Sequence, residues 1–136
     1  MITPDSLTKL KSNTSTAIPK EVSELFGHLF SMISSAHITH TYQKDKSLAT
    51  HLALEEFYTE LDELADELVE CYQGIYGQVD FTTSGKRFED CTTSIKQSYD
   101  YIDKNRTVFK ESFLQNLVDE IQARHARTLF KLKLVQ

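Results

Sequence analysis

The stretch THLALEEFYTELDELADELVE, residues 50–70, decides the fold class, because it has the pattern of a long amphipathic helix. Its apolar residues recur at intervals of three and four: Leu54, Phe57, Leu61, Leu64, Ala65 and Leu68. This is the period of an α-helix with one apolar face. The stretch also carries eight carboxylates and no Lys or Arg, although exposed helices usually mix both signs of charge. The sequence therefore predicts a helix that packs on a core and has an unusual polar face.

Three other segments show the same helical periodicity. We expect helices over about residues 19–43, 47–75, 88–103 and 107–134. In the last of these, the residues expected to face inward are Phe113, Leu117, Ile121, Leu129 and Leu132. Only four Gly and two Pro interrupt the 136 residues, which favours long helices. We predict an all-α fold, a four-helix bundle with long helices and short loops, in which residues 19–136 form one domain after a loose N-terminal arm, residues 1–18.

Composition narrows the classes of partner and location. A formal net charge of −5 is a poor match for nucleic acid or an anionic membrane, so neither is expected to bind. No apolar run approaches the roughly 20 residues that a membrane-spanning helix needs. Cys71 and Cys91 lack any motif spacing and are expected to be reduced thiols. These features predict a cytoplasmic protein without a membrane partner.

The carboxylates of the quoted stretch divide into two groups on a helical wheel. One group lies opposite the apolar stripe and is expected to form a solvated face: Glu56, Glu60, Glu63 and Glu67. The other group shares a flank of the stripe with His51: Glu55, Asp62, Asp66 and Glu70. A flank that mixes apolar and acidic residues indicates a surface that something else covers.

Two pairs on that flank have the spacing of metal ligands. His51 and Glu55 are four residues apart, as are Asp66 and Glu70, so each pair projects from one side of the helix. Imidazole and carboxylate together suit iron, manganese or zinc. One ion cannot join both pairs within a chain, because fifteen residues of helix span about 22 Å. A second copy that packs antiparallel across a two-fold axis would bring the pairs together, and His40 could add a nitrogen from across the preceding turn.

The order of these residues resembles the Dps-type miniferritins. In that family a first histidine ends one helix, as His40 does here. A histidine and an acid four residues later open the next helix, as His51 and Glu55 do. An Asp-x-x-x-Glu then follows eleven residues after that acid, and here it reads DELVE, residues 66–70. The segments HTYQKDKSLATHLALEEFYTELDELADELVECYQGIYG and LVDEIQARHARTLFKLKL also look like small Dps-like proteins of bacteriophages.

The resemblance implies a ferritin-like bundle that forms a homo-oligomer. Iron would lie at two-fold interfaces between His40, His51 and Glu55 of one chain and Asp66 and Glu70 of another. The family oxidises Fe(II) there and sequesters the product, which makes a ferroxidase activity the expectation. A phage-encoded member would work in the cytoplasm of its bacterial host or in the virion.

A second interpretation comes from a different class of protein. A bundle of this kind could have kept the fold and lost the chemistry, and could act as a phage structural protein or bind a protein or small-molecule partner. Its acidic flank would then pair with Lys or Arg of a neighbour. Two further histidines have separate expected roles. His37 competes with His40 as a ligand of the site. His125, beside Arg124 and Arg127, is expected to complement a helix dipole.

Overall fold

The computed structural model describes residues 18–42 and 47–135. The expected N-terminal arm lies almost wholly outside this range, as does position 43, where the first helix was expected to end. Four long α-helices account for most of the described residues: α2 (Lys20–Thr41), α3 (Leu48–Tyr76), α4 (Cys91–Asn105) and α5 (Ser112–Leu134). A 3-10 turn, η1 (Arg106–Val108), precedes α5, and the described residues contain no strand. The prediction of an all-α fold with four helices is confirmed.

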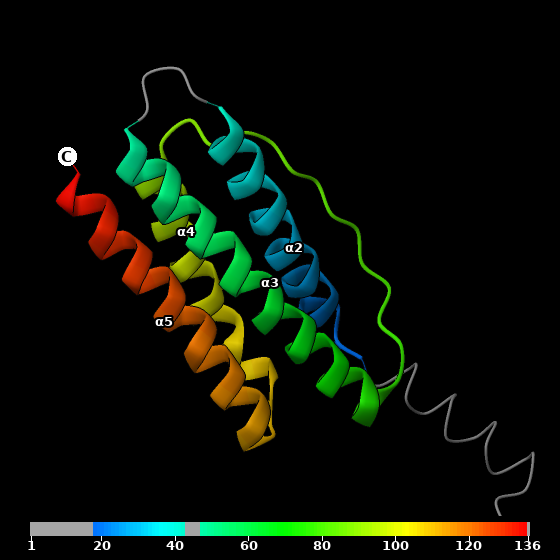
Figure 1. Ribbon diagram of the computed structural model, residues 1–136. Coiled ribbons are helices and arrows are strands. Elements are labelled where there is room, and N and C mark those ends of the chain that lie inside the picture. Colours follow the sequence, from blue (N-terminus) through cyan, green and yellow to red (C-terminus); the bar gives the residue numbers. More distant parts are fainter. Residues whose placement is uncertain (1–17, 43–46, 136) are drawn as a thin grey trace, which may run out of the picture.

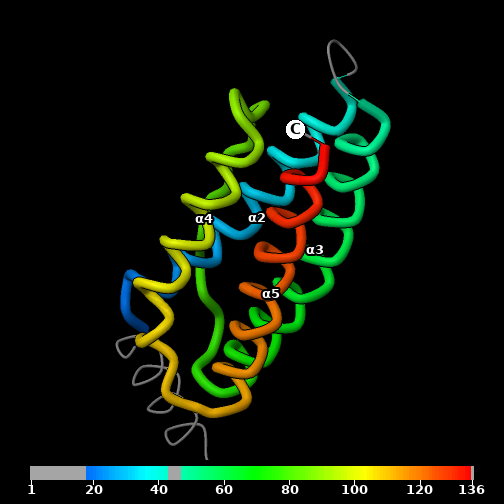
Figure 2. The backbone as a smooth tube through the Cα atoms, turned by 90° about the vertical axis from the view of Figure 1, so that its left-hand side faces the viewer, coloured from blue at the N-terminus to red at the C-terminus, as the bar shows by residue number. Residues whose placement is uncertain are grey.

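The four helices lie side by side, and a long connection follows α3 (Figure 1). α2 and α3 are antiparallel neighbours, and the chain after α3 returns along the whole of α2 as an extended segment, residues 77–90. We call this segment the crossover. It makes α4 run parallel to α3, and α5 then returns antiparallel to α4 (Figure 2). α2 packs on α3, α3 on α5 and α5 on α4, whereas the packing of α2 on α4 is the loosest among the four neighbouring pairs of helices.

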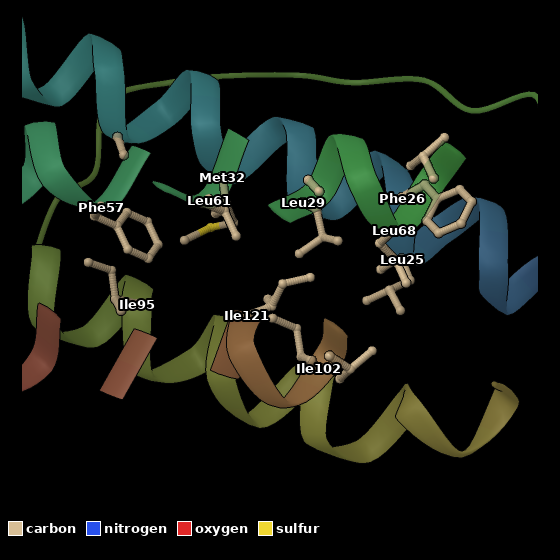
Figure 3. Close-up of a cluster of buried hydrophobic side chains, with 14 of the residues drawn as sticks. Leu25, Phe26, Leu29, Met32, Phe57, Leu61, Leu68, Ile95, Ile102 and Ile121 are labelled. Carbon is tan, nitrogen blue, oxygen red and sulfur yellow. The ribbon is translucent and has the colours of Figure 1, made fainter. Parts of the chain in front are cut away.

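One apolar core fills the space between the helices (Figure 3). Its largest fully buried apolar side chains come from all four helices: Leu25, Phe26, Leu29, Leu54, Phe57, Leu61, Leu68, Ile95, Ile102, Leu114 and Ile121. Phe109, just before α5, is also buried and lies against the rings of Phe26 and Tyr72. The apolar stripe predicted for residues 50–70 therefore faces the core: all of its residues are buried except Leu64, which is partly buried.

The start of the last helix was predicted wrongly. α5 begins at Ser112 and not near residue 107, because the segment before it is held in another conformation. The Gln115 side-chain amide donates to the carbonyls of Arg106 and Phe109, at 2.7 Å each, and so fixes the turn that buries Phe109. The inward positions of α5 consequently include Leu114 and Val118, and Phe113, which was expected inside, is 47% exposed.

A ladder of hydroxyl groups fastens the crossover to α2. Ser31 Oγ accepts the backbone N–H of Ser84 at 2.8 Å, and Ser35 Oγ accepts that of Lys86 at 3.1 Å. The third rung joins Thr39 Oγ1 to the N–H of Phe88 at 2.8 Å. Four helical residues advance about 6.0 Å and two extended residues about 6.6 Å, so the two repeats stay in step. The ladder satisfies backbone donors that no neighbouring strand could pair.

Small residues let the crossover lie directly on this face of α2. A Cβ atom on Gly27 would come within 2.4 Å of the Thr82 carbonyl oxygen, which is backbone and cannot move aside easily. A Cβ on Gly85 would meet the Ser34 hydroxyl at 2.1 Å. Gly27 continues the ladder by one turn, because it lies four residues before Ser31. The sequence G-x-x-x-S-x-x-x-S-x-x-x-T on α2 is therefore the docking track of the crossover.

The ladder predicts a specific loss of stability when its buried rung is removed. Thr39 is fully buried, and its hydroxyl also donates to Ser35 O at 2.7 Å. Thr39→Val keeps the shape but leaves the Phe88 N–H without its acceptor, so we expect the free energy of unfolding to fall by about 1–3 kcal/mol. Urea denaturation followed by circular dichroism measures this change.

Thr41→Val provides the matched control for that substitution. Thr41 lies two residues away, is exposed, and donates to Ile38 O at 2.7 Å as Thr39 donates to Ser35 O, but it holds no part of the crossover. We expect its unfolding free energy to stay within about 0.5 kcal/mol of wild type. Equal effects of the two substitutions would show that the ladder does not hold the crossover.

Candidate metal site

The end of α2 and the start of α3 bring three of the predicted ligands together. His40 lies in the last turn of α2, and His51 and Glu55 lie in the first two turns of α3. The Ser47 hydroxyl caps α3 by accepting the Thr50 N–H at 3.1 Å, which fixes where the helix begins. One ligand atom from each of His40, His51 and Glu55 lies within 4.8 Å of the others. The described residues contain no other group of three His, Cys, Asp or Glu side chains so arranged.

Two reciprocal hydrogen bonds hold the histidines of this cluster. His40 Nδ1 lies 2.9 Å from the carbonyl oxygen of His51, and His51 Nδ1 lies 2.8 Å from that of His40. A carbonyl can only accept, so both Nδ1 atoms carry a proton and donate. In the neutral rings the lone pair is then on Nε2, which is the form in which a histidine binds a metal. The rings stack with their centroids 3.7 Å apart, so the pair is already ordered.

Two aromatic side chains extend the cluster. The Tyr58 ring lies edge-on to His40 at 5.3 Å and stacks on His37 at 4.3 Å. The ring centroids of His37 and His40 are 6.2 Å apart, and the His37 ring is exposed. Burial, and then the Glu55 carboxylate, raise the pKa of Tyr58, which keeps its hydroxyl protonated. His37 therefore lies beside Tyr58 at the outer edge of the cluster and is not one of the three residues whose ligand atoms converge.

The other two predicted ligands lie further along α3. Asp66 and Glu70 are exposed, and eleven residues of helix place Asp66 about 16 Å from Glu55. Together with Glu55 and Asp62, they make no ion pair among the described residues. One chain thus supplies three predicted ligands at one place and two at another, and both places lie on the outward face of α3.

Two other acids of α3, Glu56 and Glu60, do not lie where the sequence predicted. Glu56 and Glu60 were expected on a solvated face, but they lie toward α5 and pair with its bases. Glu60 meets Arg124 at 3.0 Å, while Glu56 is bound by Lys131 and lies 3.9 Å from Arg127. The Lys131 hydrogen bond is the main cause that lowers the pKa of Glu56. The acids of α3 therefore form two unlike faces, one paired with α5 and one without cations.

A second polar cluster lies inside the bundle, and it overturns the interpretation of His125. That residue is fully buried and does not complement a helix dipole at the surface. Its Nδ1 lies 2.9 Å from Ile121 O, and its Nε2 lies 2.8 Å from Ser98 Oγ. Ser98 Oγ in turn lies 2.8 Å from His28 Nε2, so a continuous chain joins α5, α4 and α2. Burial lowers the pKa of both histidines to about 4.

The sequence contains a signal that His125 is buried, although its neighbours suggested a surface position. Ile121, His125, Thr128 and Leu132 recur at intervals of three and four residues, which is the pattern of an inward stripe. Arg124 and Arg127 beside it suggested a surface position, but each turns instead toward an acid of α3. His28 has a similar signal, since it lies three residues after Leu25 and four before Met32.

Comparison with known families identifies the family of the chain. Residues 40–132 match the model of a family described as a family of unknown function (DUF5856). The chain belongs to this family. The matched segment begins at His40 and includes all five predicted metal ligands, whereas most of α2 precedes it. Searches of curated proteins and of solved structures found no significant match. Among the described helices, none is long and apolar enough to cross a membrane.

The two internal histidines predict a loss of stability in acid. Their pKa in the folded protein, about 4, lies below the ordinary value of 6.5, so the unfolded chain binds more protons between these two values. Stability is therefore complete above pH 6.5 and falls as the pH drops toward 4. For His125 the loss corresponds to about 3 kcal/mol. Urea denaturation at a series of pH values measures it.

His125→Gln tests the source of this acid sensitivity. A glutamine amide can donate and accept hydrogen bonds as the imidazole does, but it does not titrate. We expect the variant to lose less unfolding free energy than wild type between pH 6.5 and pH 4, whatever its stability at neutral pH. If the unfolding free energy fell equally with pH in both proteins, His125 would not be the source of the acid sensitivity.

Proposed function

We propose that the protein binds a divalent metal ion, with Fe(II) as its favoured ion, at a site that a second copy of the chain completes. It would do so in the manner of the Dps-type miniferritins. The observation that carries the proposal is the cluster of His40, His51 and Glu55, whose ligand atoms are already within 4.8 Å of one another. Fe(II) is the substrate in this proposal: an external oxidant, dioxygen or a peroxide, would accept one electron from each ion, and the assembly would sequester the Fe(III) product.

The donor set fits a divalent ion of the first transition row. Two imidazoles and one carboxylate are the set found in non-haem Fe(II) sites, and they also bind zinc and manganese. Metal-binding histidines usually donate their second ring N–H to a carbonyl or carboxylate, which fixes the ring. His40 and His51 each do this with the other's backbone. Three protein ligands leave coordination positions that a partner could fill.

The order of the helices supports a ferritin-like bundle. Bundles of that class have one long crossover, whereas simple up-and-down bundles have only short loops. The crossover of this chain runs along α2 and connects the parallel helices α3 and α4 (Figure 1). This connectivity agrees with the fold that the resemblance implies.

The spacing on α3 sets the register of the proposed two-fold contact. Suppose that two α3 helices lie antiparallel with Glu55 opposite Asp66. The residue numbers of any two facing residues then add up to 121. His51 then faces Glu70 of the partner copy, and Thr59 faces Asp62. Both ligand pairs meet at once, and the two-fold axis repeats the site at the other end of the contact.

Charge makes this contact depend on the metal. The outward face of α3 carries acids and no cation, so Glu55 and Asp66 would repel each other across the axis. A divalent cation between them reverses the sign of the interaction. Leu48 and Leu52, which are 71% and 53% exposed on the same face, add apolar area at the ends of the contact. The proposal therefore links metal binding to pairing of the chains.

Removal of one ligand should weaken metal binding without harm to the fold. Glu55 is exposed, so Glu55→Gln should keep the helix and lose about tenfold or more in affinity for Fe(II), as expected for a ligand whose charge is removed. Glu63→Gln, an exposed change of equal charge on the same helix, should bind as wild type does. Anaerobic titration and elemental analysis of the desalted protein measure this difference.

A mixing experiment tests whether the site is shared between copies. His51→Gln and Asp66→Asn should each fail to bind metal alone. A dimer of one variant with the other has one site with both defects and one intact site, so an equal mixture should recover about a quarter of the wild-type metal. Solution mass, measured with and without metal, should show pairing of wild-type chains when metal is present.

The outcomes separate the two classes of function. Recovery in the mixture supports the shared site. Metal bound by Asp66→Asn at wild-type level would show that one chain suffices. Background metal in wild-type protein would reject the metal proposal and leave the interpretation of a structural or partner-binding bundle.

A further inference from the structure

The seam between α2 and α4 holds a groove that has no part in the metal site. Two adjoining hollows, of 740 Å³ and 670 Å³, share His28, Ser84 and Tyr101 in their walls. They lie where α2 packs only loosely on α4, and residues of the crossover line one side of both hollows. We call these two hollows the α2/α4 groove. Ligand sites commonly combine a cavity of this size with a few converging polar groups and a titratable group of shifted pKa.

The buried hydrogen-bond chain fixes which nitrogen of His28 carries the proton. His125 Nδ1 must donate to the Ile121 carbonyl, so in the neutral ring His125 Nε2 is an acceptor. Ser98 has one hydroxyl proton and gives it to His125 Nε2. The Ser98 oxygen then accepts from His28, which places the proton of His28 on Nε2. The lone pair of His28 is therefore on Nδ1.

His28 lines both hollows of the groove. His28 is only half-buried, and its Nδ1 has no hydrogen-bond partner among the described residues. This nitrogen is not fully enclosed by protein atoms. The Tyr101 ring lies beside it, with centroids 4.4 Å apart. Because its pKa is about 4, His28 stays a neutral acceptor at neutral pH and requires a donor from any ligand.

The charges around the smaller hollow have one sign. Its charged wall residues are Glu24 and Asp80, and no Lys or Arg of the described chain lines it. Lys20 meets Glu24 only at 3.8 Å, in a pair that is exposed on both sides. The aromatic rings of Phe81 and Tyr101 complete the wall. An acceptor, two carboxylates and two rings complement a cation that has N–H groups and an apolar part.

We propose that the α2/α4 groove binds a small organic ammonium ion. One N–H of the amine donates to His28 Nδ1, its positive charge lies near Glu24 and Asp80, and its carbon portion packs against Tyr101 and Phe81. The site uses none of the metal ligands, so it stands independently of the proposed metal function.

An anionic ligand fits these groups less well. Lys86 and Arg87 line only the larger hollow, where Glu89 and Asp90 accompany them. The Arg87 guanidinium lies over the Tyr42 ring, 3.9 Å from its centroid, and so is already engaged. An anion in the smaller hollow would meet a lone pair and two carboxylates.

Nitrogen-detected imidazole NMR tests the proposal directly. The free protein should show His28 protonated on Nε2 and not on Nδ1. Benzylammonium should shift the His28 Nδ1 resonance in a saturable way, whereas benzyl alcohol, its uncharged analogue of the same shape, should not. A proton on Nδ1 in the free protein, or equal responses to the two probes, would overturn the proposal.

Two variants of equal charge locate the binding site. Asp80 is exposed, and Asp80→Asn should weaken benzylammonium binding by about threefold, as for a partly exposed ion pair. Glu63→Gln changes the net charge equally at an exposed residue of α3 that does not line the groove, and it should leave binding unchanged. The same weakening in both variants would show a general charge effect and reject the site. Metal content, measured in parallel, should be unaffected by Asp80→Asn.

Discussion

The hydroxyl ladder on α2 is the constraint on which the arrangement of the helices depends. An extended segment that crosses the length of a bundle has backbone donors that no neighbouring strand satisfies. Here Ser31, Ser35 and Thr39 accept three of them, because four residues of helix advance almost as far as two residues of extended chain. The ladder guides the chain back to the end at which α3 began. As a result α4 runs parallel to α3, and the fourth helix can close the core.

Much of the fold followed from apolar periodicity. Helical periodicity predicted the extents of α2 and α3 closely, and the stripe quoted for residues 50–70 predicted most of the buried residues of α3, because both helices contain many Leu and Phe and few breakers. Periodicity did not predict the start of α5, because tertiary contacts set it. Phe109 packs against Phe26, and the Gln115 side chain donates a hydrogen bond to the turn before the helix. A local pattern cannot report such contacts.

The candidate site was predictable only in part, for a similar reason. Spacing placed His51 and Glu55 on one side of α3, and the short turn placed His40 nearby. It could not show that each histidine would bond the other's backbone. Glu56 and Glu60 were misjudged because their cations come from α5, more than sixty residues later in the chain. The hydrogen-bond chain of His28, Ser98 and His125 could not be predicted, because it exists only where three helices meet.

The two acidic faces of α3 show how one helix can carry the same charge for different purposes. Toward α5, Glu56 and Glu60 meet Lys131 and Arg124, and these pairs hold two helices together within the chain. On the outward face the acids have no such neighbours among the described residues. A helix stabilised on one side and left with unbalanced charge on the other presents a surface suited to a cation from outside.

The mutual bonds of His40 and His51 bear on how quickly a metal could exchange. Each ring is already fixed by the other helix, so folding has ordered both imidazoles before any ion arrives. In the proposed metal site the two rings would act as a rigid bidentate chelate, for which little entropy is lost on binding. Because His51 also satisfies a carbonyl at the open end of α2, release of the ion need not unravel either helix. Such a chelate would load and unload without refolding.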